Sequence, residues 1–471
     1  MSHSVDDSVL KAKAKRIHIE TWGCQMNVAD SEKILALMQK EDFLLTEDPS
    51  DADLIVLNTC HIREKARHKV VSRLGVLKEL KQENKELKIA VAGCVAQAEG
   101  KKLLKQAPTI DILMGPGKID ELPRLLKQRQ DSGSQAMSIG FNKPKYDDLP
   151  TGDLSCQQSV DITPSLFGKN EVSRFVNIQQ GCDNFCTFCV VPFTRGREVS
   201  ETPKVIYAKA KAHVLHGASE ITLLGQNVNS YGQDLQKNGQ IDPSSAGPFV
   251  DLLAEVASIS QLKRLRFTTS NPHDLTKPLA DLFAKERKLG TYFHLPVQSG
   301  SDVILGAMKR KVTVEEYLQR VLWLREAVPD MAISTDLIVG FPSETEEDFQ
   351  ATLDLIEKVQ FCFSYAFMYS PRKGTAAIRF KDQVPETVKA ERLARLNKLQ
   401  NEITISQNES EIGKDREVLF LYESLKEPGI YYGRTTHFRL IRVRSRRPLM
   451  GELAMVKVDG ANKTALTGSL I

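Results

Sequence analysis

Three cysteines lie within one short stretch, Gly181-Cys182-Asp183-Asn184-Phe185-Cys186-Thr187-Phe188-Cys189, directly after an expected strand. Three thiolates with this C-x3-C-x2-C spacing can bind three irons of a cubane cluster, which leaves the fourth iron without a protein ligand. A structural zinc site would need a fourth cysteine or histidine close by, and none is present. The stretch therefore predicts an iron–sulfur cluster whose open iron can chelate a substrate or cofactor.

Around this loop, strand-like and helix-like patterns alternate, which is typical of β/α units. The six expected strands are 174–179, 220–224, 264–268, 292–297, 332–339 and 361–369, and the helices expected after the first five are 202–216, 249–258, 278–287, 314–327 and 344–358. Six units predict a partial (β/α)6 barrel of the TIM type within a domain of residues 174–408. In such barrels the chemistry gathers at the carboxyl ends of the strands, where the cysteine loop begins.

The first part of the chain, 15–130, also alternates strands and helices. Expected strands are 16–22, 54–58, 87–92 and 110–114, separated by helices at 31–40, 63–79 and 97–106. Short links between strands and helices predict an α/β domain with a parallel sheet covered on both faces, in the flavodoxin-like manner. Cys24, Cys60 and Cys94 each follow one of these strands. Because the carboxyl ends of parallel strands share one edge, we expect the three thiols to meet there.

Two regions complete the chain. Residues 131–173 are rich in Ser, Gly, Asp, Pro and Gln and are interpreted as a connection between domains. Residues 409–471 contain short strand patterns separated by turn residues, which predicts a small β-barrel. This last region includes six arginines and interleaved aromatic residues. They favour nucleic-acid contact over the alternative of a basic, solvated face, and they are Arg434, Arg439, Arg442, Arg444, Arg446, Arg447, Tyr431, Tyr432, His437 and Phe438.

Composition is that of a soluble protein: 41% of the 471 residues are hydrophobic and 26% are charged. No apolar run is long enough to span a bilayer, so no membrane association is expected. The amino terminus lacks the apolar region of a secretory signal, which indicates a cytoplasmic protein. In that compartment the eight cysteines are interpreted as thiols or metal ligands rather than disulfides. The net charge of +4 is too small to indicate nucleic-acid binding by itself.

The cysteine loop, with the aromatic Phe188 just before its last cysteine, resembles the radical S-adenosylmethionine (SAM) superfamily. Members of that superfamily use a partial barrel, hold the methionine part of SAM on the open iron, and cleave SAM to a 5′-deoxyadenosyl radical. The resemblance implies a [4Fe–4S] cluster on Cys182, Cys186 and Cys189, and a place for Phe188 near the adenine.

Further stretches resemble the methylthiotransferase family, in particular its MiaB-type tRNA-modifying members. They are Trp22-Gly23-Cys24-Gln25-Met26-Asn27, Asn58-Thr59-Cys60-His61-Ile62-Arg63-Glu64-Lys65-Ala66, Gly93-Cys94-Val95-Ala96-Gln97 and Val191-Pro192-Phe193-Thr194-Arg195-Gly196-Arg197-Glu198. The C-terminal region is similar to the RNA-binding TRAM domain of that family. The resemblance covers about residues 16–471.

This likeness implies a second, auxiliary [4Fe–4S] cluster on Cys24, Cys60 and Cys94 that supplies the inserted sulfur. One SAM would methylate that sulfur and a second would supply the radical. The implied substrate is N6-isopentenyladenosine beside the tRNA anticodon, converted to its 2-methylthio derivative. The implied partners are the tRNA anticodon arm and an electron donor such as flavodoxin or ferredoxin, with the protein acting as a monomer.

Polar residues in the last part of the barrel strands or in the loops after them are candidates for SAM binding, because this is the catalytic end of such a barrel. Each is also compatible with a purely structural role, and they are Gln226, Ser270, His294, Gln298, Arg310 and Asp336. Catalytic side chains beyond the cofactor ligands are not identified. His61, Asn271, Ser343 and Lys373 depart from the residues common in the family. These departures concern the choice of substrate, because none is a cluster cysteine.

Two other functions are compatible with the sequence. Within the same chemistry, the methylthio group could go to threonylcarbamoyladenosine in tRNA or to an aspartate of a ribosomal protein. A protein of another class, a non-catalytic iron–sulfur carrier that docks on RNA, would bind the same clusters but would not cleave SAM.

Overall fold

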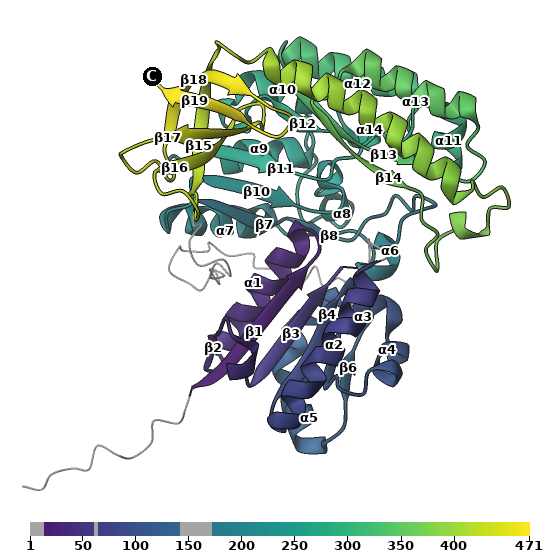
Figure 1. Cartoon of the computed structure of the whole chain (residues 1–471), viewed down its shortest axis with the longest axis vertical. Coiled ribbons are helices and arrows are strands. Elements are labelled where there is room, and N and C mark those ends of the chain that lie inside the picture. Colours follow the sequence, from purple (N-terminus) through teal and green to yellow (C-terminus); the bar gives the residue numbers. More distant parts are fainter. Residues whose placement is uncertain (1–13, 61–64, 142–171) are drawn as a thin grey trace, which may run out of the picture. The chain divides into compact units, whose positions relative to one another are not determined.

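The computed structural model describes residues 14–60, 65–141 and 172–471. The chain forms two units. Of the described residues, unit 1 contains 14–60, 65–141 and 193–196, and unit 2 contains 172–192 and 197–471. Each unit is described by itself. Their elements carry the same labels in the text and in Figure 1.

Unit 1 is built on a six-stranded sheet in which every pair of neighbouring strands is parallel. The strand order is β2 (Phe43–Leu45), β1 (Lys15–Trp22), β3 (Leu54–Thr59), β4 (Lys88–Gly93), β5 (Ile112–Met114) and β6 (Ala136–Ser138). The first five strands have the 2-1-3-4-5 order of flavodoxin-like folds, so the order reverses between β1 and β3. Ligands of such sheets bind at this point, beyond the carboxyl ends of the strands.

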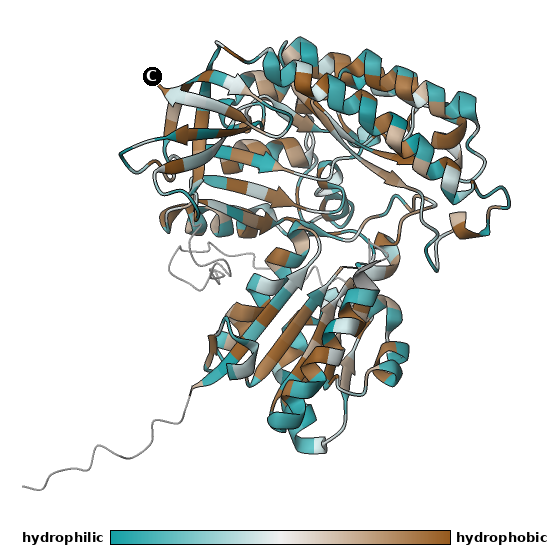
Figure 2. Ribbon diagram, viewed as in Figure 1, coloured by the Kyte–Doolittle hydropathy of each residue, from teal (hydrophilic) through white to brown (hydrophobic). Residues whose placement is uncertain are grey.

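Helices cover both faces of this sheet. They are α1 (Gln25–Gln39), α2 (Lys65–Glu83), α3 (Cys94–Glu99), α4 (Lys101–Gln106) and α5 (Leu122–Ser132). One apolar cluster joins α1 and α5 to one face, and a second joins α2, α3 and α4 to the other. The central strands are therefore predominantly hydrophobic (Figure 2), since side chains on both faces are buried.

Unit 2 contains the partial barrel, whose six parallel strands lie where the sequence predicts them. They are β7 (Ser173–Asn177), β10 (Glu220–Leu224), β11 (Arg264–Phe267), β12 (Tyr292–His294), β13 (Ala332–Val339) and β14 (Phe363–Met368), arranged in two parallel groups, β7-β10-β11 and β12-β13-β14. The main outer helices are α7 (Pro203–Leu215), α9 (Pro248–Ala257), α10 (Lys277–Lys285), α12 (Val314–Ala327), α13 (Glu346–Val359) and α14 (Glu386–Glu409). Strands and helices share a single large apolar core.

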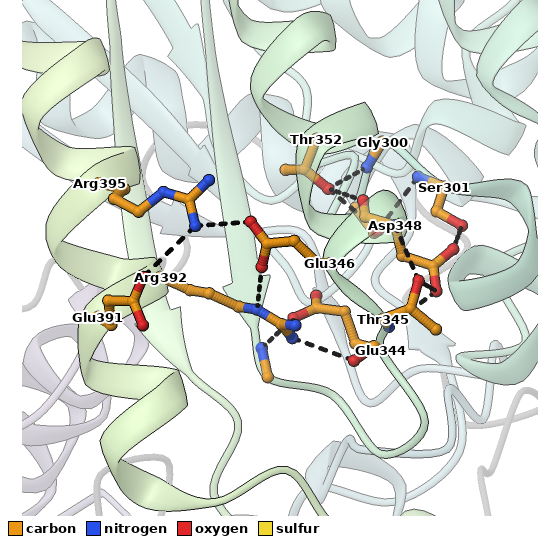
Figure 3. Close-up of polar contacts among 12 residues, drawn as sticks. Gly300, Ser301, Glu344, Thr345, Glu346, Asp348, Thr352, Glu391, Arg392 and Arg395 are labelled. Carbon is orange, nitrogen blue, oxygen red and sulfur yellow. Dashed lines mark hydrogen bonds and ion pairs between the residues drawn. The ribbon is translucent and has the colours of Figure 1, made fainter.

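A buried polar network holds the loops that follow β12 and β13 (Figure 3). The Glu344 carboxylate accepts hydrogen bonds from the Gly340 backbone N–H (2.6 Å) and from Arg392 of α14 (2.7 Å). Burial raises the pKa of Glu344, although both of these donors favour its charged form. Next to it, Asp348 of α13 accepts a hydrogen bond from Ser301 at 2.5 Å. The network thus fixes the chain at the carboxyl ends of two barrel strands.

The Arg392→Gln variant is expected to lower the free energy of unfolding by about 3–5 kcal/mol, because it leaves the buried Glu344 charge without its partner. A matched control lies one turn further along α14, where Arg395 pairs with Glu346 at 2.6 Å and is 39% exposed. Arg395→Gln should cost at most about 1 kcal/mol, as is usual for exposed pairs. Urea denaturation of both variants checks this. Equal losses for the two variants would contradict the account.

The C-terminal region forms a closed five-stranded barrel in the order β15-β16-β17-β19-β18. Its strands are β15 (Asp415–Glu423), β16 (Ile430–Thr435), β17 (Leu440–Arg444), β18 (Leu453–Ala461) and β19 (Leu466–Leu470). Alternate side chains fill its interior, including Val418, Phe420, Ile441 and Val456. The fold class is therefore α/β, with a flavodoxin-like sheet, a partial TIM-type barrel and a small C-terminal β-barrel.

The small barrel packs against the amino ends of the large barrel's strands. Arg264, the first residue of β11, is 2% exposed and donates hydrogen bonds to the Arg434 and Thr435 carbonyl oxygens at 2.7 and 3.3 Å. Phe438 stacks on Tyr292 of β12, with their ring centroids 4.5 Å apart. The C-terminal barrel is thus fixed at the opposite end of the strands from the cysteine loop.

Candidate active site

The cysteine loop of unit 2 is anchored by its backbone and by Thr187. The Thr187 N–H and hydroxyl donate to the carbonyl oxygens of Met308 (3.0 Å) and Ala307 (2.9 Å), and its own carbonyl accepts from the Ala377 N–H at 2.9 Å. Phe188 packs against an apolar cluster that includes Met308 and Phe341. These contacts hold the loop beyond the carboxyl end of β7, where sequence analysis expects the chemistry.

The three sulfurs lie among hydrogen-bond donors. The Asn184 side chain donates to Cys182 Sγ at 3.6 Å, the Val191 N–H to Cys189 Sγ at 3.4 Å, and an Arg310 Nη to Cys186 Sγ at 3.8 Å. Burial raises the pKa of Cys182 to about 11 and that of Cys189 to about 12. Since metal ligands bind as thiolates, cluster binding here must release protons.

Several expected SAM-binding residues carry buried polar atoms that have no hydrogen-bond partner among the described residues. They are Gln226 Nε2, Ser270 Oγ and Arg310 Nε. The other end of the Gln226 amide accepts from the Gly181 N–H at 2.5 Å, so this side chain contacts the cysteine loop directly. Unsatisfied buried polar atoms are costly and require a partner. A polar ligand such as SAM fits this requirement.

The remaining candidates form a second group, on and after β12 and β13. His294 Nδ1 lies 2.8 Å from Ser334 Oγ, and His294 Nε2 lies 3.5 Å from the Asp336 carboxylate. Gln298 adopts φ +83°, and its N–H donates to the Asp336 carbonyl at 2.9 Å. A non-glycine residue in this conformation is held by its surroundings. Asp336 therefore contacts both of the other candidates, His294 through its carboxylate and Gln298 through its backbone carbonyl.

The carboxyl edge of the unit 1 sheet brings the other three cysteines together. The last residues of β1, β3 and β4 are paired with one another: Trp22 with Thr59, and Thr59 with Gly93. The three cysteines come one or two residues after these paired positions, so they begin at the same level of the sheet. The loop after β1 can lie close to Cys60 only because residue 23 is glycine: an added Cβ there would lie 2.5 Å from the Cβ of Cys60. Beneath these positions, the buried amides of Asn27 and Asn58 are joined by a hydrogen bond of 3.0 Å.

The thiol pKa is shifted in opposite directions for Cys24 and Cys94. A hydrogen bond with Cys60 is the largest of the effects that lower the pKa of Cys24 to about 6, and the charge of Arg195 adds to it. Cys24 is also the N-cap of α1, where the helix dipole favours an anionic sulfur. Burial raises the pKa of Cys94, against the effects of Arg195 and of a hydrogen bond with Thr194. Thr194 and Arg195 lie in the stretch 191–198 that resembles the family, but no local pattern there predicts that they lie beside these cysteines.

Within the described residues, no three His, Cys, Asp or Glu side chains converge on a single ion position. A mononuclear zinc site needs such convergence. The cysteines of a cubane bind different irons and need not meet at one point. Three thiolates in each group match the protein ligands of a cubane cluster with one open iron.

The basic stretch of the C-terminal barrel divides into two sets. The first set belongs to the junction with the large barrel. Arg439 donates hydrogen bonds to Gln407 and Asn408 of α14, and a ring nitrogen of His437 lies 2.8 Å from the Asp330 carboxylate. Arg434 stacks on the ring of Phe438. The outer face instead carries a cross-strand row, Tyr422, Tyr432 and Arg442, with the two tyrosine rings stacked 5.2 Å apart. Beyond this row the exposed arginines are Arg444, Arg446 and Arg447.

Comparisons with known proteins match both units. Residues 16–115 match the uncharacterized protein family UPF0004, and residues 176–356 match the radical SAM superfamily. A curated tRNA-2-methylthio-N(6)-dimethylallyladenosine synthase of Ehrlichia canis is 42% identical over 96% of this chain and 99% of its own. The Geotalea uraniireducens protein of the same name is 41% identical over 97% and 99%.

Among solved structures, the radical SAM methyltransferase TsrM of Kitasatospora setae is 11% identical and superimposes with a TM-score of 0.54 over 75% of each chain, a likeness of fold alone. No helix in the described residues combines the length and apolarity needed to cross a membrane. Identity above 40% over nearly the whole of both chains shows the family. The chain belongs to the tRNA-2-methylthio-N(6)-dimethylallyladenosine synthases of the radical SAM superfamily.

Proposed function

We propose that this protein is a radical SAM methylthiotransferase that converts N6-isopentenyladenosine beside the tRNA anticodon to its 2-methylthio derivative. The observation that carries the proposal is the identity to synthases of that name over 96% of the chain. Two groups of three cysteines, each at the carboxyl edge of a parallel sheet, support it. We further propose that the protein is a cytoplasmic monomer and receives electrons from a flavodoxin or ferredoxin.

Each domain of the chain has its own role in the proposed function. Residues 15–130, together with β6, would hold the auxiliary [4Fe–4S] cluster on Cys24, Cys60 and Cys94. Residues 174–408 would hold the radical cluster and SAM, and residues 409–471 would bind RNA, with the part of 131–173 that follows β6 as the connection. When bound, the two clusters would supply the electron that cleaves SAM and the site at which sulfur is carried.

The side chains around the radical cluster orient the cofactor. The guanidinium group of Arg310, hydrogen-bonded to the Pro296 carbonyl at 2.6 Å, places positive charge beside Cys186 and suits a carboxylate. Gln226 and Ser270 offer polar atoms for the cofactor's ribose, adenine or methionine groups. Phe188, in its apolar cluster, provides a dry surface for an adenine ring. Each of these roles is part of the proposal.

Nucleoside analysis of a deletion strain tests the function. Mass spectrometry of its tRNA should show loss of 2-methylthio-N6-isopentenyladenosine and accumulation of N6-isopentenyladenosine, with both restored by the wild-type gene. Unchanged 2-methylthio-isopentenyladenosine would reject the proposal. Loss of a methylthio group from threonylcarbamoyladenosine or from a ribosomal protein instead would reassign the substrate within the same chemistry.

For the tRNA partner, the outer face of the C-terminal barrel is the proposed contact. Arg444→Gln should weaken tRNA binding and reduce the slope of log affinity against log salt by about one, because one phosphate contact is lost. Tyr432→Ala should cost about 1–3 kcal/mol of binding through lost base stacking, with the slope unchanged.

Filter binding or fluorescence anisotropy at several salt concentrations measures both effects. Lys285→Gln, an exposed cation on α10 of the same unit, serves as the matched control and should bind as wild type does. Point variants are preferable to deletion of the barrel, since deletion would expose the buried charge of Arg264. If Arg444→Gln and Tyr432→Ala bind like the control, the proposed contact is wrong.

A further inference from the structure

A four-residue segment that follows the radical-cluster loop belongs by its contacts to unit 1. It is Phe193–Gly196, whereas the residues immediately before and after it belong to unit 2. Thr194 and Arg195 are buried, at 2% and 4% exposure. Gly196 has φ +86°, and an added Cβ there would lie 2.9 Å from the Phe141 ring. The segment is thus built into the unit that carries Cys24, Cys60 and Cys94.

Arg195 forms a buried ion pair inside this unit. Its Nη2 lies 2.7 Å from the Asp30 carboxylate, and the two side chains are 4% and 9% exposed. Asp30 lies on α1, the helix for which Cys24 is the N-cap. Burial opposes the charge of Arg195, but Asp30 and the sulfurs of Cys94 and Cys24 outweigh this effect and raise the pKa of Arg195. The guanidinium group therefore lies within electrostatic reach of both cysteines.

A buried ion pair is an inefficient way to stabilise a fold, because desolvation offsets most of its attraction and apolar replacements are often as stable. This pair lies within electrostatic reach of two of the three prospective cluster ligands, Cys24 and Cys94, and the Thr194 hydroxyl contributes a hydrogen bond to Cys94. The reduction potential of an iron–sulfur cluster depends on net charge, hydrogen bonds to sulfur and solvent exposure. The placement supplies one cluster with two individual charges of opposite sign, from Arg195 and Asp30, and with a hydrogen bond from Thr194.

We propose that Arg195 and Asp30 set the reduction potential of the auxiliary cluster, an inference that rests on the proposed function. They act through their charges as positioning residues and are not cluster ligands. One-electron reduction adds one negative charge to the cluster. The Arg195 cation stabilises the reduced form and the Asp30 anion destabilises it, so the two side chains have opposite effects.

The test is an EPR-monitored redox titration of the full-length chain in which Cys182, Cys186 and Cys189 are alanine, so that only the auxiliary cluster contributes. In this background Arg195→Gln should shift the midpoint potential to lower values and Asp30→Asn should shift it to higher values. Arg195→Lys, which keeps the charge, should lie close to the parent. The matched control is Arg129→Gln, which breaks an Arg–Asp pair with Asp111 (2.8 Å) before β5, at the amino edge of the sheet.

Opposite shifts with an unshifted control support the proposal. Unchanged potentials, or shifts in the same direction, overturn it. Loss of the cluster in Arg195→Gln, Asp30→Asn and Arg195→Lys alike would indicate a purely structural pair and would also overturn it. If the alanine background itself binds no iron, the proposed function fails, and this result is distinguished from the others by iron analysis before any titration.

Discussion

Formation of 5′-deoxyadenosine is expected to fall to the level of a protein-free control when Cys182, Cys186 and Cys189 are replaced together by alanine. These sulfurs are the only ligands that the loop offers to a cubane, and the loop leaves one iron open for SAM. Without the cluster no electron reaches the sulfonium. The measurement is anaerobic incubation of reconstituted protein with dithionite and SAM, followed by chromatography of the nucleoside product.

Cys362→Ala is the matched control for this experiment. Cys362 is a buried thiol of the same unit, it immediately precedes β14, and burial raises its pKa to about 12. Its replacement should leave SAM cleavage intact. Wild-type protein that yields no 5′-deoxyadenosine would favour the non-catalytic carrier, and a triple variant that still yields it would place the radical chemistry elsewhere.

Methylthiolation of tRNA is expected to be lost when Cys24, Cys60 and Cys94 are replaced together by alanine. This variant should still cleave SAM, because the loop at 182–189 and the contacts that hold it lie in unit 2. It should form no 2-methylthio product on isopentenylated tRNA, because the auxiliary site that carries sulfur is gone. The two triple variants thus separate radical formation from sulfur insertion.

Both products can be followed in one reaction, by liquid chromatography of 5′-deoxyadenosine and mass spectrometry of the digested tRNA. Arg129→Gln again provides a unit 1 control, at the edge of the sheet remote from the cysteines, and it should retain both activities. Full methylthiolation by the alanine variant of Cys24, Cys60 and Cys94 would exclude an auxiliary cluster on these residues.

Much of the fold could be predicted because strong local patterns coincide with it. The six barrel strands and α12 (Val314–Ala327) lie where the sequence pattern places them. The same holds for the edge shared by Cys24, Cys60 and Cys94, since strand–helix alternation predicts a parallel sheet and the carboxyl ends of parallel strands lie at one edge. Two strands of the flavodoxin-like sheet escaped prediction. β2 and β6 are the two edge strands, and each buries only one of its three residues, whereas the equally short β5 buries all three. In addition, β6 lies inside the stretch interpreted as a connection.

Long-range pairing could not be predicted from local pattern. Asp30 and Arg195 are 165 positions apart, and neither belongs to a spacing typical of metal ligands. The basic stretch of the C-terminal barrel shows the same limitation. Its composition favours nucleic acid throughout, but Arg434, His437 and Arg439 contact the large barrel, because they lie at the end of β16 and in the turn before β17, which packs against that barrel. The outward-facing residues could be separated from these only once the register was known.

The most direct test of the central claim is the iron and sulfide content of protein purified and reconstituted without oxygen. Two cubane clusters require about eight irons and eight sulfides per chain, and either triple alanine variant should retain about four of each. Mössbauer spectra of the two variants should each show a [4Fe–4S] cluster. A wild-type content of about four irons, unchanged when Cys24, Cys60 and Cys94 are replaced, would contradict the account.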